Sequence, residues 1–273
     1  MEGILYDGAG NLFLMCDARA DEALSAGLRP GEAAAACAGA PVRVDGLILL
    51  LDPSTPDTDF SMHYYNRDGS GGMMCGNGGR CVVSFARDLG ILPASPDGVY
   101  RFGAAGSIYT GEILEDSGAR KRVKLRLPDV TVAERLSDPK GWFLDTGCPH
   151  FVSFLEDASA LGQLDIVPAA LPLRHHPAFP EGVNVDFVAP LSDGGFSIRT
   201  FERGVEAETL ACGTGIVASA ISAALEKGLA GAVRLDFKAL GGVLSVDLTL
   251  PAERSSGTPA ATGIFLTGPT RRH

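Results

Sequence analysis

Short apolar or alternating runs dominate this chain, and glycine, proline, aspartate and serine separate many of them. Strands are predicted at "LILLLD", "SMHYYN", "RVKLRL", "HFVSFL", "VNVDFVAP", "FSIRTFE" and "GGVLSVDLTL". Runs rich in branched and aromatic side chains and bounded by turn residues are typical of β-strands. The pattern therefore predicts a largely β core.

Helical periodicity is clearest in two segments, each of which follows a cysteine and a glycine. The apolar positions of these segments are Val82, Phe85, Ala86 and Leu89 in the first, and Val217, Ala220, Ile221, Ala224 and Leu225 in the second. Gly90 and Gly228 follow at the positions where a helix commonly stops. We expect one helix in each half of the chain.

The same turn sequence introduces both helices. Cys75 begins "CGNG" and Cys212 begins "CGTG", about half the chain length apart, and Asn66 and Arg203 each stand nine positions earlier at a predicted strand end. A period this long with two copies indicates an internal duplication and not a solenoid.

We therefore predict an α/β (α+β) fold of two pseudo-symmetric domains. Each is expected to be a mostly antiparallel sheet curled around a central helix, with the active site in the cleft between the two domains. We place the N-terminal half at residues 1–127 and the C-terminal half at 128–262, and a strand near 263–273 is a candidate to join the first half.

Composition narrows the class of function. The 273 residues are 45% hydrophobic, which is enough to bury two cores, and the net charge is −10. An acidic chain lacks the basic face that nucleic acid or an anionic membrane requires. The N-terminus has no secretory pattern, and no apolar run approaches the length of a membrane span. We expect a cytoplasmic protein that binds a small molecule, with a homodimer as an open alternative.

The six cysteines are best interpreted as reduced thiols, because no secretory signal accompanies them. No pair has Cys-x-x-Cys spacing and the histidines form no metal motif, so no metal is expected. Nucleotide-binding glycine motifs are also lacking, and nothing in the sequence requires a cofactor. Cys16, Cys37 and Cys81 receive no functional role.

A cysteine at the start of a helix has a chemical consequence. The first backbone N–H groups of a helix lack partners and carry the positive end of its dipole, so they bind carboxylates and favour a thiolate. The alternative is that Cys75 and Cys212 are small apolar residues at tight turns, but their matching positions favour a function. Inversion at a carbon that bears a carboxylate needs one proton carrier on each face, which one thiolate and one thiol would supply.

Several motifs together resemble the diaminopimelate epimerases, a family of two-cysteine enzymes that use no pyridoxal cofactor. They are "GAGNLF", "YYNRDGSGGMMCGNGGRC", "TGCPHFV", "FPEGVNVDFV", "FERGVEAETLACGTG", "GGVLSVDL" and "LTGP", which cover nearly the whole chain. The resemblance implies a cofactor-independent epimerase that interconverts L,L- and meso-2,6-diaminopimelate, in the synthesis of lysine and of peptidoglycan precursors.

The resemblance also implies roles for individual residues. Cys75 and Cys212 would be the acid and base, supported by His150. The main-chain amides that would hold the reacting carboxylate belong to Gly76, Asn77, Gly213 and Thr214. The residues that would hold the distal carboxylate are Asn11, Asn66, Asn184 and Arg203, while Glu202 would receive an ammonium group. The guanidinium fork of Arg203 suits a carboxylate, because it can bind both oxygens.

Two positions depart from the family pattern. Cys148 stands where the motif Gly-Asn-Pro-His commonly has asparagine, and Leu12 stands where Gly-Asn-Asp-Phe has aspartate. Cys148 is thus a candidate substrate contact of an unusual kind.

The alternative functions are a racemase of the same fold for another amino acid, such as histidine, or a non-catalytic amino-acid-binding protein. The asparagines could also be turn residues, Glu202 and Arg203 a surface pair, and His150 a hydrogen-bonded core histidine.

Overall fold

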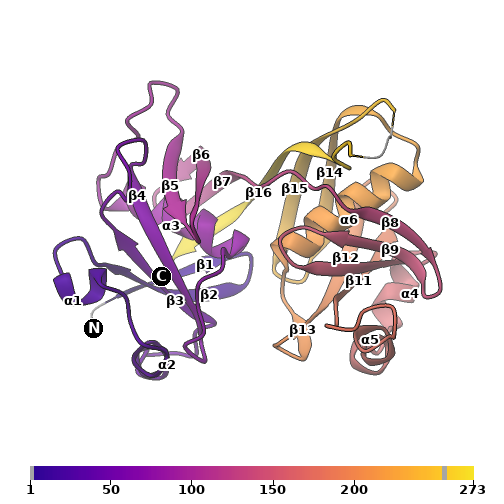
Figure 1. The fold of residues 1–273 in the computed structure, drawn as a ribbon, viewed down its shortest axis with the longest axis horizontal. Helices are drawn as coiled ribbons and strands as arrows, with labels where there is room; N and C mark the ends of the chain where they lie inside the picture. The colour runs from indigo at the N-terminus through magenta and orange to yellow at the C-terminus, as the bar shows by residue number, and fades with distance from the viewer. Residues whose placement is uncertain (1–2, 254–256) are drawn as a thin grey trace. The chain divides into compact units, whose positions relative to one another are not determined.

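A computed structural model describes residues 3–253 and 257–273, and the chain divides into two compact units. The first unit comprises Met1–Arg126 and Thr267–His273, and the second comprises Leu127–Leu266. The chain thus leaves the first unit at Arg126 and re-enters it at Thr267. Each unit has its own set of strands and its own central helix (Figure 1), and the strands of both units belong to one continuous hydrogen-bonded sheet.

The sheet of the first unit is built from seven consecutive strands and the end of an eighth. The consecutive strands are β1 (Ile4–Gly8), β2 (Asn11–Asp17), β3 (Gly46–Leu51), β4 (Phe60–Asn66), β5 (Tyr100–Ala104), β6 (Ser107–Ser117) and β7 (Arg120–Arg126), and they are neighbours in that order. β2–β3 and β4–β5 are parallel pairs, whereas β1–β2, β3–β4, β5–β6 and β6–β7 are antiparallel. β16 (Thr262–Arg272) neighbours β7 and also pairs with β1, so the sheet closes on itself.

The second unit repeats this arrangement. Its strands are β8 (Ala133–Ser137), β9 (Lys140–Asp145), β10 (Pro149–Phe154), β11 (Asn184–Pro190), β12 (Phe196–Glu202), β13 (Ala207–Thr209), β14 (Gly231–Ala239) and β15 (Gly242–Leu250). β10–β11 and β12–β14 are parallel, and β9–β10, β11–β12 and β14–β15 are antiparallel. The sequence of pairings from β9 to β15 therefore matches that from β1 to β6, as the duplicated motifs predicted.

One long helix is enclosed by each sheet. α3 (Gly76–Asp88) contacts β1, β2, β3, β4, β6 and β7, and α6 (Gly213–Glu226) contacts β9, β10, β11, β14 and β15. Both helices are buried over most of their length, because a strand faces nearly every side of them. Gly90 (φ 78°) and Gly228 (φ 63°) lie just beyond the helix ends in the left-handed region, which confirms the predicted stops.

Four shorter helices, which the periodicity did not indicate, cover the outside of the sheets. They are α1 (Glu22–Ser25), α2 (Pro30–Ala38), α4 (Ala158–Gln163) and α5 (Ile166–Arg174). α2 packs on β3 and β4 through a cluster that includes Ala33 and Cys37, while α4 and α5 pack on β11 and β12 around Leu161 and Ile166. Within residues 3–253 and 257–273, no helix has the length and apolar character needed to cross a membrane.

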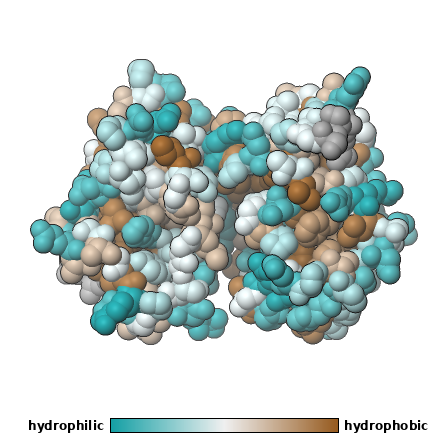
Figure 2. Space-filling model, in the orientation of Figure 1, coloured by the Kyte–Doolittle hydropathy of each residue, from teal (hydrophilic) through white to brown (hydrophobic). Residues whose placement is uncertain are grey.

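The surface mixes polar and apolar side chains. Several large apolar residues are exposed, among them Met73, Leu92, Val205 and Leu240. On the face that Figure 2 shows, brown residues are interspersed with teal and white ones over both units. Apolar residues scattered in this way are normal on a protein surface and indicate no binding site by themselves.

Candidate active site

Cys75 is the N-cap residue of α3. Its backbone is extended (φ −106°, ψ 117°), and its Sγ accepts a hydrogen bond from the N–H of Gly78 at 3.4 Å. A side chain in this role satisfies one of the N–H groups that every helix leaves without a partner in its first turn. The sulfur is partly exposed. The predicted position of Cys75, at the positive end of a buried helix, is therefore what the structure shows.

Behind Cys75, the first turn of α3 is held by a buried arginine that the sequence analysis did not single out. Arg80 is fully buried and donates from Nη2 to the side-chain oxygen of Asn77 at 2.8 Å and from Nη1 to the carbonyl of Gly76 at 3.4 Å. Burial lowers the pKa of the guanidinium. Asn77 in turn donates to the side-chain oxygen of Asn11. Arg80, Asn77 and Asn11 thus form one chain of hydrogen bonds beside the helix N-terminus.

Asp45 fixes the turn that carries Asn11. Its Oδ2 accepts the backbone N–H of Leu12 at 3.0 Å and the side-chain amide of Asn11 at 3.3 Å. Leu12, which replaces the aspartate of the family motif, packs its side chain against an apolar cluster. The Asp45 carboxylate therefore orients the side chain of Asn11. The side chain of Asn66 accepts a hydrogen bond from the Tyr64 hydroxyl at 2.7 Å and donates to the Ser70 hydroxyl at 2.9 Å.

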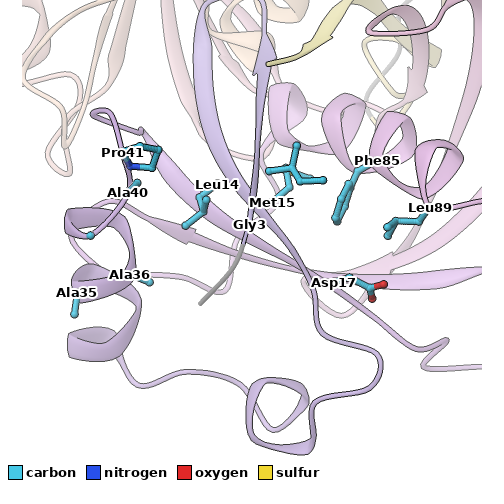
Figure 3. Close-up of a pocket in the computed structure, with 12 residues that line it drawn as sticks. Gly3, Leu14, Met15, Asp17, Ala35, Ala36, Ala40, Pro41, Phe85 and Leu89 are labelled. Carbon is cyan, nitrogen blue, oxygen red and sulfur yellow. The ribbon is translucent and has the colours of Figure 1, made fainter.

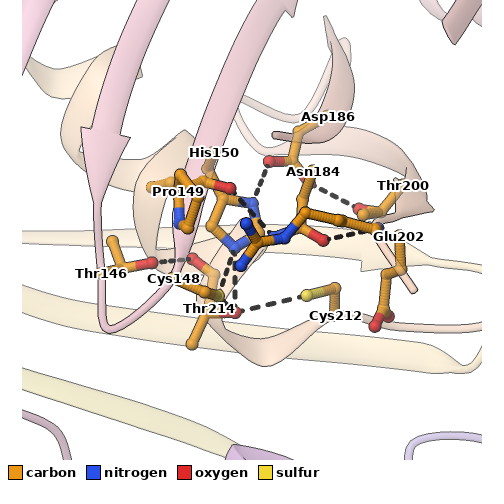
Figure 4. A network of polar contacts seen from close by, with 12 residues as sticks. Thr146, Cys148, Pro149, His150, Asn184, Asp186, Thr200, Glu202, Cys212 and Thr214 are labelled. Carbon is orange, nitrogen blue, oxygen red and sulfur yellow. Dashed lines mark hydrogen bonds and ion pairs between the residues drawn. The ribbon is translucent and has the colours of Figure 1, made fainter. Parts of the chain in front are cut away.

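Cys212 occupies the same position in the second unit. It is the N-cap residue of α6 with φ −107° and ψ 111°, and its Sγ lies 3.3 Å from Oγ1 of Thr214 in the first turn. The Thr214 hydroxyl also lies 3.0 Å from Nε2 of His150 and 3.3 Å from Sγ of Cys148 (Figure 4). One hydroxyl thus connects two thiols and an imidazole at the N-terminus of α6.

His150 lies on β10 and is fully buried. Its Nδ1 is 2.7 Å from Oδ2 of Asp186 on β11, and its Nε2 is 3.3 Å from Sγ of Cys148. Burial alone would lower the pKa of His150, but the Asp186 carboxylate and the Cys148 sulfur outweigh burial and raise the pKa well above 6.5. The second oxygen of Asp186 accepts the hydroxyl of Thr200 at 2.6 Å. The Asp186 carboxylate therefore favours the protonated imidazole and fixes its orientation.

Cys148 responds to that imidazolium. Burial raises the pKa of the thiol, but the charge of His150 and hydrogen bonds with His150 and Thr214 lower it to a net value below 9.0. Desolvation and the Glu202 carboxylate instead raise the pKa of Cys212 to about 12. Desolvation also raises the pKa of Glu202, whose Oε1 accepts the Thr209 hydroxyl at 2.5 Å. The two cysteines that contact Thr214 thus have pKa values shifted in opposite directions, downward for Cys148 and upward for Cys212.

Asn184 and Arg203 are joined to each other and to the strand that carries His150. The side chain of Asn184 donates to the carbonyl of Pro149 at 2.9 Å and accepts the backbone N–H of Arg203 at 2.8 Å. Nη1 of Arg203 donates to the carbonyls of Glu181 and Gly182, at 3.2 and 3.5 Å. These contacts hold one nitrogen of the guanidinium in place, and its remaining donors can serve a ligand.

A large pocket in the first unit lies apart from the residues around Cys75. Its volume is about 790 Å³, and the residues that line it include Leu14, Met15, Ala36, Phe85 and Leu89 (Figure 3). Phe85 and Leu89 lie at the C-terminal end of α3, whereas Cys75 caps the N-terminal end. The lining includes the carboxylate of Asp17 but none of the predicted site residues, so we do not assign the chemistry to this pocket. Among the described residues, no His, Cys, Asp and Glu side chains are grouped as a metal ion requires.

Comparison with known proteins identifies the family. The sequence profile of diaminopimelate epimerase matches residues 4–96 and 142–264, which include both N-cap cysteines and the His150 cluster. The chain belongs to the diaminopimelate epimerase family. A diaminopimelate epimerase from Hydrogenobaculum sp. is 36% identical over 98% of this chain and 94% of its own length, and one from Aquifex aeolicus is 38% identical over 84% and 83%.

Solved structures show the same fold in more distant proteins. A phenazine biosynthesis protein of the PhzF family from Bacillus anthracis aligns with a TM-score of 0.72 at 15% identity, over 100% of this chain and 97% of that one. A hydroxyproline epimerase from Agrobacterium vitis aligns with a TM-score of 0.68 at 14% identity, over 99% and 89%. At these identities the likeness is one of fold. It confirms the predicted fold class for this diaminopimelate epimerase family member.

Asp186 and Arg80 are buried charged residues of this site that the sequence analysis missed. Each is a charged residue inside a segment that is otherwise buried, in "VNVDFV" and in the first helix. A charge in such a position needs a buried partner. That signal was present in the sequence of this family member, but it does not reveal which partner the charge contacts.

Proposed function

We propose that this chain interconverts L,L- and meso-2,6-diaminopimelate by proton transfer at one α-carbon, without a cofactor. The observation that carries this proposal is the pair of N-cap cysteines, Cys75 and Cys212, with the same backbone conformation at the start of two buried helices. Membership of the diaminopimelate epimerase family, with relatives of that name matching nearly the full length, supports the choice of substrate.

In this proposal the two helix N-termini hold the carboxylate of the reacting centre. The backbone amides of Gly76 and Asn77 in α3, and of Gly213 and Thr214 in α6, belong to first turns whose N–H groups favour an anion. The same amides stabilise the negative charge that develops as the α-proton leaves. This charge stabilisation makes the weakly acidic α-proton accessible to a thiolate.

The two cysteines carry the proton on opposite faces of the α-carbon. Cys212 suits the donating role, because its raised pKa keeps it a thiol at neutral pH. Cys75 then removes the proton as the base, and the roles exchange in the reverse direction. His150, with its proton held by Asp186, lies one hydroxyl away from Cys212 through Thr214 and orients that thiol.

The distal end of the substrate is assigned to polar groups of both units. Asn11 and Asn66 in the first unit, and Asn184 and Arg203 in the second, bind the distal carboxylate in this proposal, and Glu202 receives an ammonium. The contacts of Arg203 with two backbone carbonyls support a positioned guanidinium. Cys148 contacts His150 and Thr214, which favours a role near the proton chemistry over one at the distal carboxylate.

We further propose that the reaction takes place in the cytoplasm, as a step of lysine and peptidoglycan-precursor synthesis. Within the part of the chain that the structure describes, the six cysteines form no disulfide, which suits a reducing compartment. The substrate is a free amino acid, and a homodimer stays a prediction. Neither a nucleic acid nor a membrane is a proposed partner.

The test is exchange of the α-hydrogen in deuterated water. Purified protein should incorporate solvent deuterium at the α-carbon of diaminopimelate and convert the L,L isomer to the meso isomer. A panel with alanine, lysine, histidine and proline tests the substrate in the same experiment. Faster turnover of histidine or another mono-acid would replace the substrate assignment. Binding of diaminopimelate without exchange would instead identify a binding protein and contradict the enzyme.

A further inference from the structure

Cys148, His150 and Asp186 form a line of contacts, and the sulfur of Cys148 at one end of it has no assigned step in the proposed reaction. Sγ of Cys148 lies 3.3 Å from Nε2 of His150, and the opposite ring nitrogen lies 2.7 Å from the carboxylate of Asp186. His150 and Asp186 are both fully buried, so neither exchanges this contact for water. A thiol next to an imidazole that a carboxylate orients is the arrangement that activates a cysteine as a nucleophile.

The surroundings of the sulfur strengthen this activation. Cys148 also lies 3.3 Å from the hydroxyl of Thr214, in the first turn of α6, where the helix dipole favours an anion. Its side chain is partly exposed, whereas Cys16 and Cys37 are buried among apolar residues and burial raises the pKa of each. Cys148 therefore combines access to small reagents with a stabilised thiolate.

A second sulfur lies within reach in the same unit. Oγ1 of Thr214 is 3.3 Å from Sγ of Cys148 and 3.3 Å from Sγ of Cys212, so the two sulfurs are separated by no more than twice that distance. Figure 4 shows the two side chains on either side of this hydroxyl. Rotation about the Cα–Cβ bonds changes the separation of the two sulfurs further. Both residues belong to the second unit, so their proximity depends on that unit alone.

We propose that Cys148 is a modification site for hydroperoxides, and that Cys212 resolves the oxidised sulfur as a disulfide closed within the second unit. In the first step the Cys148 thiolate attacks one peroxide oxygen, a sulfur–oxygen bond forms and the oxygen–oxygen bond breaks. The leaving oxide takes a proton and departs as water or an alcohol. The sulfur is oxidised by two electrons, and the peroxide is reduced by two.

In the second step the sulfur of Cys212 attacks the sulfenic acid of Cys148. A sulfur–sulfur bond forms, the sulfur–oxygen bond breaks, and the hydroxide leaves as water with the proton of Cys212. Because the raised pKa of Cys212 leaves little of it as thiolate, we expect this step to be slower than the first. A small dithiol then reduces the disulfide to two thiols and is itself oxidised to a disulfide. The disulfide removes Cys212 as a proton carrier. The resulting loss of activity rests on the proposed function, whereas the modification itself does not.

The experiment uses the full-length reduced protein with equimolar hydrogen peroxide. Free thiols are then blocked with a maleimide, and peptides are mapped by mass spectrometry. We expect a peptide pair joined through Cys148 and Cys212 that dithiothreitol releases. Linkage of Cys212 to Cys75 instead, or peroxide modification that leaves Cys148 untouched, overturns the proposal. Cys148 oxidised beyond the sulfenic acid without any disulfide overturns the resolving role of Cys212.

Two alanine variants provide a matched comparison. Relative to its own starting activity, Cys148→Ala should lose turnover about tenfold more slowly in peroxide than the wild type, because the fast first step is gone. Cys37→Ala should be inactivated at the wild-type rate. Equal inactivation of Cys148→Ala and the wild type contradicts the proposal.

A measurement on the unmodified chain avoids any dependence on folding of a variant. Iodoacetamide alkylation of each cysteine is followed by mass spectrometry against pH, and the midpoint for Cys148 is expected below 9.0, the ordinary value for a thiol. A midpoint at or above that value overturns the proposal. Deuterium exchange by the reduced enzyme is measured alongside, so a failure of this proposal and a failure of the epimerase assignment remain distinguishable.

Discussion

His150 Nδ1 lies 2.7 Å from Asp186 Oδ2. The two residues belong to the neighbouring parallel strands β10 and β11, and both side chains are fully buried against Gly215 in the first turn of α6. Strand register brings the two residues together. Asn184 on β11 is the register partner of His150 on β10, and Asp186 follows two residues later on the same face of the sheet. Removal of one member of such a pair leaves a charge buried without its partner. The contact thus orients the imidazole and depends on exact packing around it.

A substitution at Gly215 tests how tightly the helix packs against His150 and Asp186. Gly215 is the third residue of α6, and a Cβ at this position would collide with Oδ1 of Asp186 and lie 3.1 Å from Cε1 of His150. Gly215→Ala should destabilise the protein by about 1 to 3 kcal/mol, although alanine is the better helix former. Urea denaturation measures the change. The matched control is Gly162→Ala in α4, where no atom lies within 4 Å of the added Cβ and stability should be unchanged or raised.

The N-cap cysteines should be indispensable for inversion. Cys75→Ala and Cys212→Ala should each reduce epimerisation of diaminopimelate by several orders of magnitude, because each change leaves one face of the α-carbon without a proton carrier. Cys37, which lies on α2 and packs in an apolar cluster, gives the control, and Cys37→Ala should retain turnover. Steady-state rates from the separated isomers measure the effect. Normal turnover by Cys75→Ala would eliminate the two-cysteine mechanism.

The duplicated cysteine turns were sufficient to predict the two buried helices and the mostly antiparallel sheets around them. The short helices escaped prediction for local reasons. α5 contains Pro172, which normally argues against a helix interior, and α2 is mostly alanine, so neither shows an amphipathic period. These helices form because they cover the apolar outer faces of β3 and β11, which is a tertiary effect.

The supporting residues of the site were harder to predict than the cysteines. Asp186 lies in a strand whose neighbouring residues are mostly apolar, and its partner His150 is 36 residues away in the sequence. The hydrogen bond between Asn11 and Asn77 likewise joins residues 66 positions apart. Spacing along a chain cannot specify such contacts, because they depend on strand register. The roles assigned to these residues in binding substrate stay predictions.

Arg203 should decide the choice of substrate. If its guanidinium pairs with the distal carboxylate, a mono-acid leaves that charge without a partner, and such a site can reject the poorer ligand by roughly 10⁴-fold. Arg203→Ala should therefore abolish turnover of diaminopimelate, measured as kcat/KM. Arg234, an exposed residue that pairs with Asp247, provides the control, and Arg234→Ala should retain activity. Unchanged kcat/KM in Arg203→Ala would show that the distal carboxylate binds elsewhere.

The protons of His150 and Cys148 should determine how stability varies with pH. In the folded protein the pKa of His150 is raised above 6.5 and that of Cys148 is lowered below 9.0. Between these two pH values, the raised pKa makes folded His150 hold more of its proton than the unfolded chain does, and the lowered pKa makes folded Cys148 hold less. The contributions of the two groups to the pH dependence of the free energy of unfolding should therefore oppose each other and offset in this window.

Cys148→Ala should remove that balance. The imidazole keeps its proton in the folded state because Asp186 still contacts it, whereas above pH 6.5 the unfolded chain has lost the proton. A raised pKa gives stability that is lost as pH rises, so the variant should lose up to about 1.4 kcal/mol per pH unit between 6.5 and the folded pKa. Urea denaturation from pH 6.5 to 9 measures this slope, with Cys37→Ala as the control. Parallel curves for Cys148→Ala and the wild type would mean that Cys148 is protonated at neutral pH, which contradicts both the imidazolium–thiolate pair and its proposed reactivity.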